Sequence, residues 1–344
     1  RSMMLCLKYP SSISGNKVRI SKRITRSIDR GYRRVKGKGQ KTVIKTRMVS
    51  YNAARSKIPA VIRRGMLMRI FITGANGQLG KALQQELSRY ELLSTDLPEL
   101  DITVRGDIED AVLDFQPAVV IHCAAYTDVE EAARNPALAY KVNGLGTQNV
   151  ALACMRSGAD MVHLSTNEVF GGDYLEGYEE WMPVHPRNPY ARSKAAAEFH
   201  VRGILANYYI VRTAWLFAEG GRNFIHAILD AAREGRPLRV VSDEVGNPTY
   251  AVDLAEALGK LILRRQYGTY HFVNEGSCSR LTFAREALRL SGLEDVKVTP
   301  ILSSEYTRAS VPPLNSSLKN IAGAAIGIRL RPWQEALAEY LGQI

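Results

Sequence analysis

A glycine-rich loop between a short apolar run and a helical segment constrains the fold more than any other feature of this chain. Residues 69–73 (RIFIT) form the apolar run, and the loop that follows reads GANGQLG. Glycines at such a place let the backbone turn tightly and approach a pyrophosphate, while the next helix points its N-terminus at the phosphate charge. The loop therefore predicts a dinucleotide site, whose residues are Gly74, Asn76, Gly77, Gln78, Leu79 and Gly80.

Short apolar runs alternate with helical segments downstream of this loop. Strands are expected at 91–95, 117–124, 160–165 and 208–213, and helices at 78–90, 136–157 and 189–206. This alternation is typical of a parallel sheet covered by helices. We therefore expect an α/β fold, namely a Rossmann-type doubly wound parallel sheet with a smaller C-terminal substrate lobe.

The same pattern predicts how the chain divides. Residues 69–220 are expected to form the dinucleotide-binding Rossmann domain, and 239–263 to return to it. The substrate-binding lobe is expected to consist of 221–238 and 264–344. Residues 1–68 show no sustained helix or strand period, so we expect a basic, disordered extension there.

The positive charge of the chain is concentrated in this extension. Residues 1–68 hold 19 Lys and Arg against one acid, Asp29, and the remainder holds 27 basic and 33 acidic residues, a net charge of −6. The charge pattern thus argues against nucleic acid as a partner of the folded part. Three interpretations of the extension stay open: a disordered basic arm, an organelle transit peptide or, as we favour, upstream sequence before a start at Met66 or Met68.

Cysteine spacing and hydropathy bound the class of protein further. Cys6, Cys123, Cys154 and Cys278 stand far apart, and no Cys/His cluster has metal-ligand spacing, so we expect no metal site. The most apolar stretches are interrupted by His or Arg, so we expect no membrane span. Both observations favour a reduced, cytoplasmic protein.

An acid ends the second predicted strand. Asp96 stands where a carboxylate accepts hydrogen bonds from the adenosine ribose hydroxyls and repels a 2′-phosphate. This position favours NADH over NADPH. Because Arg105 lies downstream and offers a counter-charge, both cofactors stay open.

A tyrosine and a lysine lie on one face of the predicted helix over 189–206. Tyr190 and Lys194 follow a strand that ends in Ser165 and Thr166. Reduction of a carbonyl needs a proton donor at the developing alkoxide, and a nearby cation makes a tyrosine usable as that acid by lowering its pKa. We therefore expect Tyr190 as the acid and Lys194 as the cation. Thr166 is expected to bind the substrate oxygen, and a nicotinamide to supply the hydride.

Further motifs narrow the comparison to one family. They are HCAAYTDVEEAARNPALAYKVN at 122–143, LSTNEVFGG at 164–172, NPYARSK at 188–194, VRTAWLF at 211–217 and SDEVGNPTYAVDLAEAL at 242–258. With the glycine loop, they resemble the dTDP-4-dehydrorhamnose reductases of the extended short-chain dehydrogenase/reductases, over about residues 69–344. The resemblance implies an NADH- or NADPH-dependent reductase of a 4-keto-6-deoxy nucleotide sugar. The expected reaction is dTDP-4-dehydro-L-rhamnose to dTDP-L-rhamnose, and a homodimer stays open.

The resemblance also implies roles for further residues. The glycine loop, Asp96, Tyr190 and Lys194 are already expected to contact the cofactor. The resemblance adds six residues along it: Asp101, Ile102, Ala124, Ala125, Tyr126 and Asn143. Those expected near the nucleotide sugar are Thr127, Val129, Asn167, Glu168 and Trp215.

Two departures from the family pattern concern substrate recognition. The family commonly reads Ser-Thr-Asp-Tyr-Val-Phe-Asp-Gly where residues 165–172 are STNEVFGG, so Glu168 replaces a substrate-side aromatic residue. Pro312 and Pro313 stand where the family has Arg-Pro before Asn-Ser. These changes leave the hydride-transfer residues intact, so the reaction class is better determined than the sugar.

Three other functions stay open on the same fold. The TNEV at 166–169 also resembles the Thr-Asp-Glu-Val of nucleotide-sugar 4,6-dehydratases, but Asn167 cannot donate the proton that a dehydration needs. A nucleotide-sugar epimerase is distinguished by recycling its bound NAD rather than consuming it. A non-catalytic cofactor-binding regulatory subunit, like that of methionine adenosyltransferase, has no need of Thr166, Tyr190 and Lys194.

Overall fold

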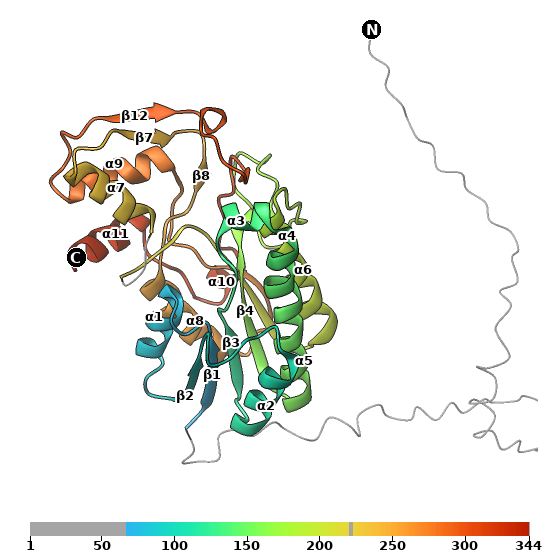
Figure 1. Ribbon diagram of the computed structural model, residues 1–344. Helices are drawn as coiled ribbons and strands as arrows, with labels where there is room; N and C mark the ends of the chain where they lie inside the picture. Colours follow the sequence, from blue (N-terminus) through green and yellow to red (C-terminus); the bar gives the residue numbers. More distant parts are fainter. Residues whose placement is uncertain (1–66, 220–222, 344) are drawn as a thin grey trace, which may run out of the picture. The chain divides into compact units, whose positions relative to one another are not determined.

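A computed structural model describes residues 67–219 and 223–343, and nearly all of the predicted basic extension lies outside them (Figure 1). The described part is built on a six-stranded parallel sheet in the order β10-β5-β4-β3-β1-β2. Its strands are β1 (Arg69–Thr73), β2 (Glu91–Thr95), β3 (Val119–His122), β4 (Asp160–Thr166), β5 (Tyr208–Thr213) and β10 (Gly268–His271).

The strand order makes the sheet doubly wound, as the sequence predicts. β1 pairs with β2 on one side and with β3 on the other, so the chain progresses outward in opposite directions from β1. β3 and β4 are buried along their whole length because helices cover both faces of the sheet. The crevice at the carboxyl ends of β1 and β3, where the winding reverses, is where such sheets bind ligands.

Helices lie on both faces of the sheet (Figure 1). On one face pack α2 (Arg105–Phe115), α5 (Thr147–Ser157) and α6 (Pro189–Ile204), and on the other α1 (Gln78–Glu86) and α8 (Ala251–Arg264). The alternation of side chains along β1 divides the core, because Ile70 and Ile72 belong to the α1/α8 side and Phe71 to the α2/α5 side. Short helices α3 (Val129–Arg134), α4 (Pro136–Ala139) and α10 (Ala322–Ala325) complete the layers.

The turn after β1 explains the first glycine of the loop. Gly74 has a φ of 72°, and a Cβ at this position would lie 2.5 Å from the backbone N of Ala124. Only glycine combines this left-handed conformation with so close an approach to the segment after β3. The loop is thereby held against the crevice, and its last three residues form the start of α1.

The predicted helix over 136–157 is wrong in one respect. The chain forms α4, then a π-helix, η2 (Tyr140–Gly146), and then α5. One extra residue per turn hardly changes the spacing of apolar residues over a single turn, so the pattern predicts one continuous α-helix. The other predicted strands and helices are confirmed to within a few residues at their ends.

A smaller lobe follows β5. It contains a two-stranded parallel sheet of β7 (Leu238–Val241) and β12 (Val298–Ile301), packed with α7 (Phe224–Arg233), α9 (Arg280–Leu290) and α11 (Trp333–Leu341). An aromatic cluster around Phe217, Phe283 and Tyr340 fills its core. The remaining elements are the short pairs β6 (Leu216–Phe217) with β9 (Thr249–Tyr250) and β8 (Val245–Gly246) with β11 (Cys278–Ser279), and the 3-10 helices η3 (Asn167–Val169) and η4 (Ser303–Glu305).

The observed pairing differs from the expected domain boundaries in two places. β10 lies in the segment 264–344 expected for the lobe, yet it pairs with β5 at the edge of the main sheet. Within 239–263, only α8 packs with the main sheet, against α1, while β7 pairs with β12 in the lobe. Both strands are only four residues long, and so short a segment carries no information about which sheet it joins.

Within the described ranges, no helix has both the length and the apolar character needed to cross a membrane.

Candidate active site

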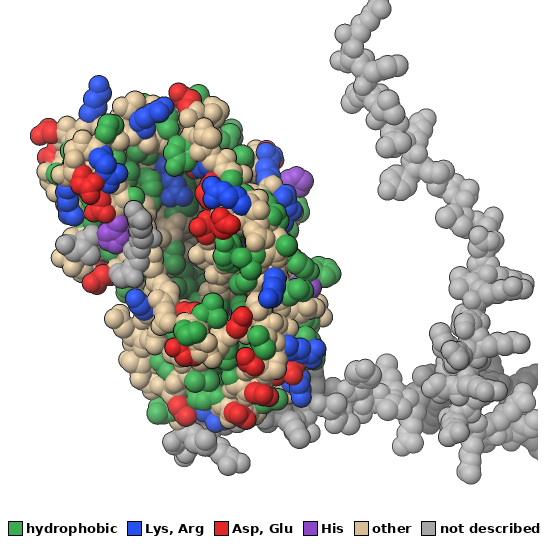
Figure 2. Space-filling model, viewed as in Figure 1, with side chains coloured by type: hydrophobic (Ala, Val, Ile, Leu, Met, Phe, Trp, Pro, Cys, Tyr) green, Lys and Arg blue, Asp and Glu red, His purple; other side chains and the backbone are tan. Residues whose placement is uncertain are grey.

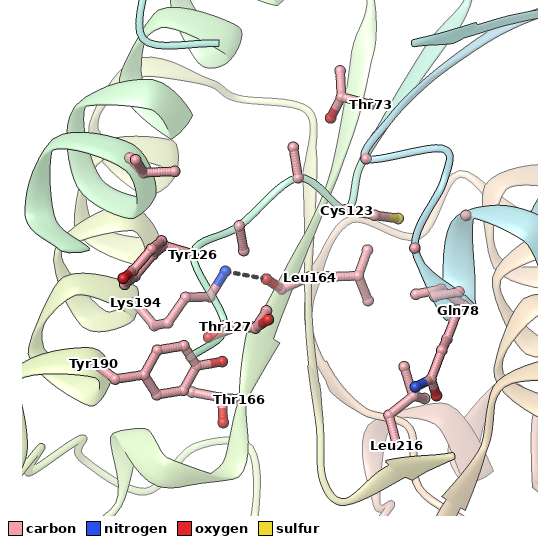
Figure 3. A pocket seen from close by; sticks show the side chains of 18 of the residues that line it. Thr73, Gln78, Cys123, Tyr126, Thr127, Leu164, Thr166, Tyr190, Lys194 and Leu216 are labelled. Atoms are coloured by element: carbon pink, nitrogen blue, oxygen red, sulfur yellow. Dashed lines mark hydrogen bonds between the residues drawn. The ribbon is translucent and has the colours of Figure 1, made fainter. Parts of the chain in front are cut away.

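A cavity of about 940 Å³ lies at the carboxyl ends of the strands. Figure 2 shows the surface hollowed between the sheet and the lobe, and Figure 3 shows side chains that line the cavity. The glycine loop, the ends of β2, β3 and β4, the start of α6 and the segment after β5 all contribute to its walls. Of the residues that the sequence predicts for catalysis, cofactor and substrate, every one except Asn143 lines this cavity.

The start of α6 brings Tyr190 and Lys194 to the cavity. Asn188 caps the helix, because its Oδ1 accepts a hydrogen bond of 2.8 Å from a backbone N–H of the first turn, and Pro189 is the first helical residue. Tyr190 and Lys194 then lie one turn apart. In Figure 3 both side chains lie on the same side of the cavity as Thr166, at the end of β4.

Lys194 is buried, and its ammonium group donates a hydrogen bond of 2.6 Å to the Leu164 carbonyl oxygen (Figure 3). Burial lowers the pKa of Lys194 to about 8, although the carboxylate of Glu198 acts to raise it. Lys194 is therefore a cation at neutral pH that loses its charge in mildly alkaline solution.

A buried ion cluster lies one turn beyond Lys194 on α6. The carboxylate of Glu198 accepts two hydrogen bonds from Arg212, at 2.9 and 2.8 Å, one from Arg202 at 2.9 Å and one from the Ser165 hydroxyl at 2.6 Å. Although burial acts to raise it, the contacts with Arg212 bring the pKa of Glu198 below its ordinary value. Because Ser165 precedes Thr166, the cluster ties α6 to the end of β4.

The pKa of Tyr190 departs from the expectation. Burial raises it, the charge of Glu168 raises it further, and a hydrogen bond with the Thr166 side chain opposes both. The expected lowering by Lys194 is not among these effects, since the ammonium group of Lys194 is directed at the Leu164 carbonyl. In this structure the phenol is thus held firmly in its protonated form.

Asn143 lies in the π-helix η2, fully buried behind the cavity wall. Its Oδ1 accepts a hydrogen bond of 2.7 Å from the Tyr126 N–H, and its Nδ2 donates to the Tyr126 carbonyl at 3.0 Å and to the Ser193 hydroxyl at 2.9 Å. Asn143 therefore fixes the loop after β3 against α6. This differs from the direct place along the cofactor that the resemblance implies.

Asp96 lies at the other end of the cavity, beside the glycine loop. Its Oδ2 accepts a hydrogen bond of 2.9 Å from the Asn76 N–H, and its Oδ1 accepts one of 2.9 Å from the Leu97 N–H. The carboxylate thus holds the loop, and each oxygen keeps a lone pair for a further donor.

The cavity suits a dinucleotide on two observations. First, the N-cap residue of α1 is Gly77, which has no side chain to cap the helix, and the first turn holds no acid, so the N–H groups of that turn are available to an anion. Second, three residues that line the cavity each hold a buried polar atom without a partner in the described part of the chain: Oε1 of Gln78, Oγ1 of Thr95 and Oγ1 of Thr213. Because such atoms are costly to bury unpaired, a polar ligand is favoured here.

Trp215 stands where the sheet meets the lobe. It has a φ of 42°, a strained conformation for a bulky residue, and a Cβ on Gly246 would lie 2.6 Å from its indole ring. The absence of a side chain at Gly246 therefore leaves room for the indole against β8. Thr127 and Val129 line the cavity from the loop and helix after β3.

Glu168 lies in η3, two residues after Thr166. Its Oε2 accepts a hydrogen bond of 2.7 Å from the Asn188 side chain. Burial raises the pKa of Glu168, whereas the Asn188 hydrogen bond and the charge of Arg280 lower it. Asn167 is committed elsewhere, because its Nδ2 donates to the Ser316 hydroxyl at 2.6 Å and its Oδ1 accepts from Thr166 at 3.2 Å.

Sequence reasoning missed Arg280, the first residue of α9, which lines the cavity from the lobe. No motif of the sequence marks it. Asn188, which connects α6 to Glu168, has a readable signal, since Asn before Pro is typical of a helix start. Over residues 67–219 and 223–343 there is no group of three or more His, Cys, Asp or Glu able to hold a metal ion.

The doubly wound parallel sheet, the glycine loop at its crevice and the Tyr190/Lys194 pair beside Thr166 define a class of protein, the extended short-chain dehydrogenase/reductases. Within this class, the sequence model of the family described as RmlD substrate binding domain matches residues 68–344. The chain belongs to that family.

Several relatives bear the name dTDP-4-dehydrorhamnose reductase. The one from Streptomyces griseus is 39% identical over 280 residues, covering 79% of this chain and 92% of the relative. The spore coat polysaccharide biosynthesis protein SpsK of Bacillus subtilis is 37% identical, covering 80% of this chain and 97% of its own. A crystal structure of the reductase from Bacillus anthracis in complex with NADP superposes with a TM-score of 0.79 at 39% identity, covering 81% of this chain and all of that one.

More distant structures share the fold alone. A dTDP-glucose 4,6-dehydratase from Streptomyces venezuelae, solved with NAD, has a TM-score of 0.69 at 18% identity.

Proposed function

We propose that this chain is an NAD(P)H-dependent reductase of a 4-keto-6-deoxy nucleotide sugar, converting dTDP-4-dehydro-L-rhamnose to dTDP-L-rhamnose. The observation that carries the proposal is that Thr166, Tyr190 and Lys194 share one cavity with the glycine loop. Relatives named for this reaction, which match over more than nine-tenths of their length, support the choice of substrate.

Each catalytic residue has a part that its surroundings favour. Tyr190, whose pKa is raised by burial, stays protonated and donates its proton to the developing alkoxide. The Thr166 hydroxyl donates to the Asn167 Oδ1 in this structure, and we propose that it turns to donate to the substrate oxygen and keeps that oxygen in line with the phenol. Lys194, whose buried ammonium group lines the same cavity, supplies donors and a positive charge that we propose hold the ribose beside the nicotinamide.

The nicotinamide cofactor, when bound, supplies the hydride. The first turn of α1 and the loop 74–80 are suited to its pyrophosphate, and Asp96 to its adenosine ribose. Asp101 and Ile102 border the same end of the cavity and are proposed to lie along the adenine. Ala124, Ala125 and Tyr126, held by Asn143, form the wall between the two ends.

The alternative of a 4,6-dehydratase is disfavoured by Asn167, because both ends of its amide are bonded to protein groups and an amide has no acidic proton to give. The amount of cofactor consumed per sugar converted distinguishes a reductase from an epimerase and from a regulatory subunit. The test incubates the purified chain with NADH or NADPH and a panel of 4-keto nucleotide sugars. One equivalent of cofactor oxidised per 4-keto group reduced supports the proposal. Turnover of a 4-keto sugar without net oxidation supports an epimerase, and conversion of a nucleotide hexose that carries a 6-hydroxyl into its 4-keto-6-deoxy product without net oxidation supports a dehydratase.

We expect Asp96→Asn to raise the ratio of kcat/KM for NADPH over NADH by roughly five- to tenfold, since one unit of negative charge near a 2′-phosphate is removed. Asparagine retains an oxygen for the Asn76 N–H, so the loop stays in place. Steady-state kinetics with both cofactors measures the ratio. An unchanged ratio contradicts the placement of the adenosine ribose at Asp96.

We expect kcat/KM to fall as the pH rises past about 8, because Lys194, whose pKa burial lowers to about 8, loses its charge there. Stability responds with the opposite sign. Between about pH 8 and 10.5 the unfolded chain binds more protons at this lysine than the folded one, so its contribution to the free energy of unfolding rises with pH. Rate profiles and urea unfolding over this range test both directions, and a rate that stays constant to pH 10 contradicts the assignment.

We propose further that the lobe closes over the sugar, and that the chain works in the cytoplasm, where reduced nicotinamide cofactors are available. The cysteines Cys123, Cys154 and Cys278 are free thiols, in keeping with a reducing compartment.

A further inference from the structure

A second cavity, of about 320 Å³, adjoins the first. It lies mostly in the lobe, between α7, β7 and the segment 306–313. The residues that line both cavities are Val129, Asn167, Glu168, Trp215 and Arg280. A ligand that occupies both cavities therefore passes Arg280 at their junction.

Arg280 is held in place by aromatic rings rather than by ion pairs. Its guanidinium group lies 3.7 Å from the centre of the Trp215 ring and 5.2 Å from that of Phe224. No side-chain hydrogen bond or salt bridge of Arg280 is found with any residue of the described ranges. Stacking fixes the plane of the guanidinium and leaves the N–H groups on its edge for a ligand.

The neighbouring charges set Arg280 apart from the other arginines of the second cavity. Arg308 is bonded to Glu244, so its charge is already matched, and Arg239 is exposed to solvent. Burial lowers the pKa of Arg280 to about 10, and the charges of Glu244 and Glu168 raise it, so the guanidinium stays charged at neutral pH. Arg280 is thus a half-buried cation whose N–H groups remain available to a ligand.

We propose that Arg280 binds the diphosphate that joins the sugar to the nucleoside, and that the second cavity holds the nucleoside. The proposal rests on the proposed function and adds the residue that recognises the anion. A planar guanidinium presents paired N–H groups that match phosphate oxygens, which makes it the preferred group for this contact. Phe224, Ile228 and Pro312 supply apolar walls for a base in the second cavity.

Glu168 makes one side of the junction between the two cavities unfavourable for a phosphate. Its carboxylate influences both the phenol of Tyr190 and the guanidinium of Arg280, so it lies alongside the path from the reacting carbonyl to the diphosphate. A carboxylate there repels a phosphate and accepts hydrogen bonds from sugar hydroxyls. The diphosphate is thereby directed to Arg280 and the sugar to Thr166.

The test is a calorimetric titration of the full chain, with NADP⁺ present, by thymidine 5′-diphosphate and by thymidine. We expect Arg280→Gln to raise the Kd of thymidine 5′-diphosphate by roughly 10- to 100-fold, as for the loss of charge-assisted hydrogen bonds, and to leave the Kd of thymidine unchanged. Arg239→Gln, at the exposed arginine of the same cavity, is the matched control and is expected to change both values less than threefold. Arg280→Lys keeps the charge without the planar fork and is expected to fall between wild type and Arg280→Gln.

Equal weakening of thymidine and thymidine 5′-diphosphate by Arg280→Gln indicates that Arg280 only supports the Trp215 stack, and overturns the proposal. Unchanged affinity for thymidine 5′-diphosphate in both Arg280 variants also overturns it. If either result is found and the wild-type protein still oxidises NADPH in the presence of the keto sugar, this inference is wrong and the proposed function stands. If the wild-type protein neither binds thymidine 5′-diphosphate nor oxidises the cofactor, both the proposed function and this inference are wrong.

Discussion

Tyr190→Phe is expected to lower kcat by about 10²–10⁴-fold, the range for loss of a positioned general acid. The substitution removes only the phenolic oxygen and keeps the half-buried ring, so folding and NADPH binding are expected to persist. Stopped-flow measurement of NADPH oxidation under single-turnover conditions isolates the reduction step from product release.

Thr166→Val is the comparison for this experiment. It removes a hydrogen bond to the substrate oxygen but leaves the proton source, so the loss of kcat is expected to be smaller than for Tyr190→Phe. Near wild-type turnover of Tyr190→Phe with its cofactor bound would falsify the assignment of the acid. Glu168, the carboxylate beside Thr166, then becomes the next candidate, and Glu168→Gln tests it.

Glu198→Ala is expected to lower the free energy of unfolding by about 3–5 kcal/mol, because it leaves the guanidinium of Arg212 buried without its counter-ion. Both side chains are almost completely inaccessible to solvent, so water cannot replace the lost contacts. Urea unfolding followed by circular dichroism is expected to show a lower midpoint with an unchanged m-value. The Ser165 hydroxyl also loses its acceptor, so the end of β4 becomes less constrained.

Lys260→Gln is the matched control for this prediction. Lys260 forms an ion pair of 2.6 Å with Glu256 on α8, where both side chains are 54% exposed, and its loss is expected to cost about 0.5 kcal/mol or less. A midpoint shift for Glu198→Ala no larger than that of the control would mean that Arg212 finds another partner after the carboxylate is lost.

Features that depend on local sequence were predictable. Each strand from β1 to β5 is a compact apolar run, and the glycine loop and the spacing of Tyr190 and Lys194 are local patterns. Their meeting in one crevice follows from the parallel topology, because the carboxyl ends of all the strands lie at one edge of the sheet. The cavity could therefore be assembled from the sequence almost completely.

Features that depend on tertiary packing were not predictable. The π-helix that holds Asn143 differs from an α-helix by one residue in a turn, and its effect is a contact with Tyr126 across the cavity wall. Arg280 looks like an ordinary residue at a helix start until the fold brings it onto Trp215. The pKa of Tyr190 could not be inferred either, because it depends on burial and on Glu168 rather than on the lysine one turn away.

The chain enters the lobe after β5, returns to the sheet for α8 and β10, and then crosses to the lobe again for α9 and α11 (Figure 1). The lobe is therefore built from segments that precede and follow α8 and β10 rather than from one appended module. Exchange of sugar preference between relatives by recombination consequently requires several segments to be transplanted together. A single crossover after β5 would move the whole lobe together with α8 and β10, and would therefore separate β10 from its partner strand β5 and α8 from α1.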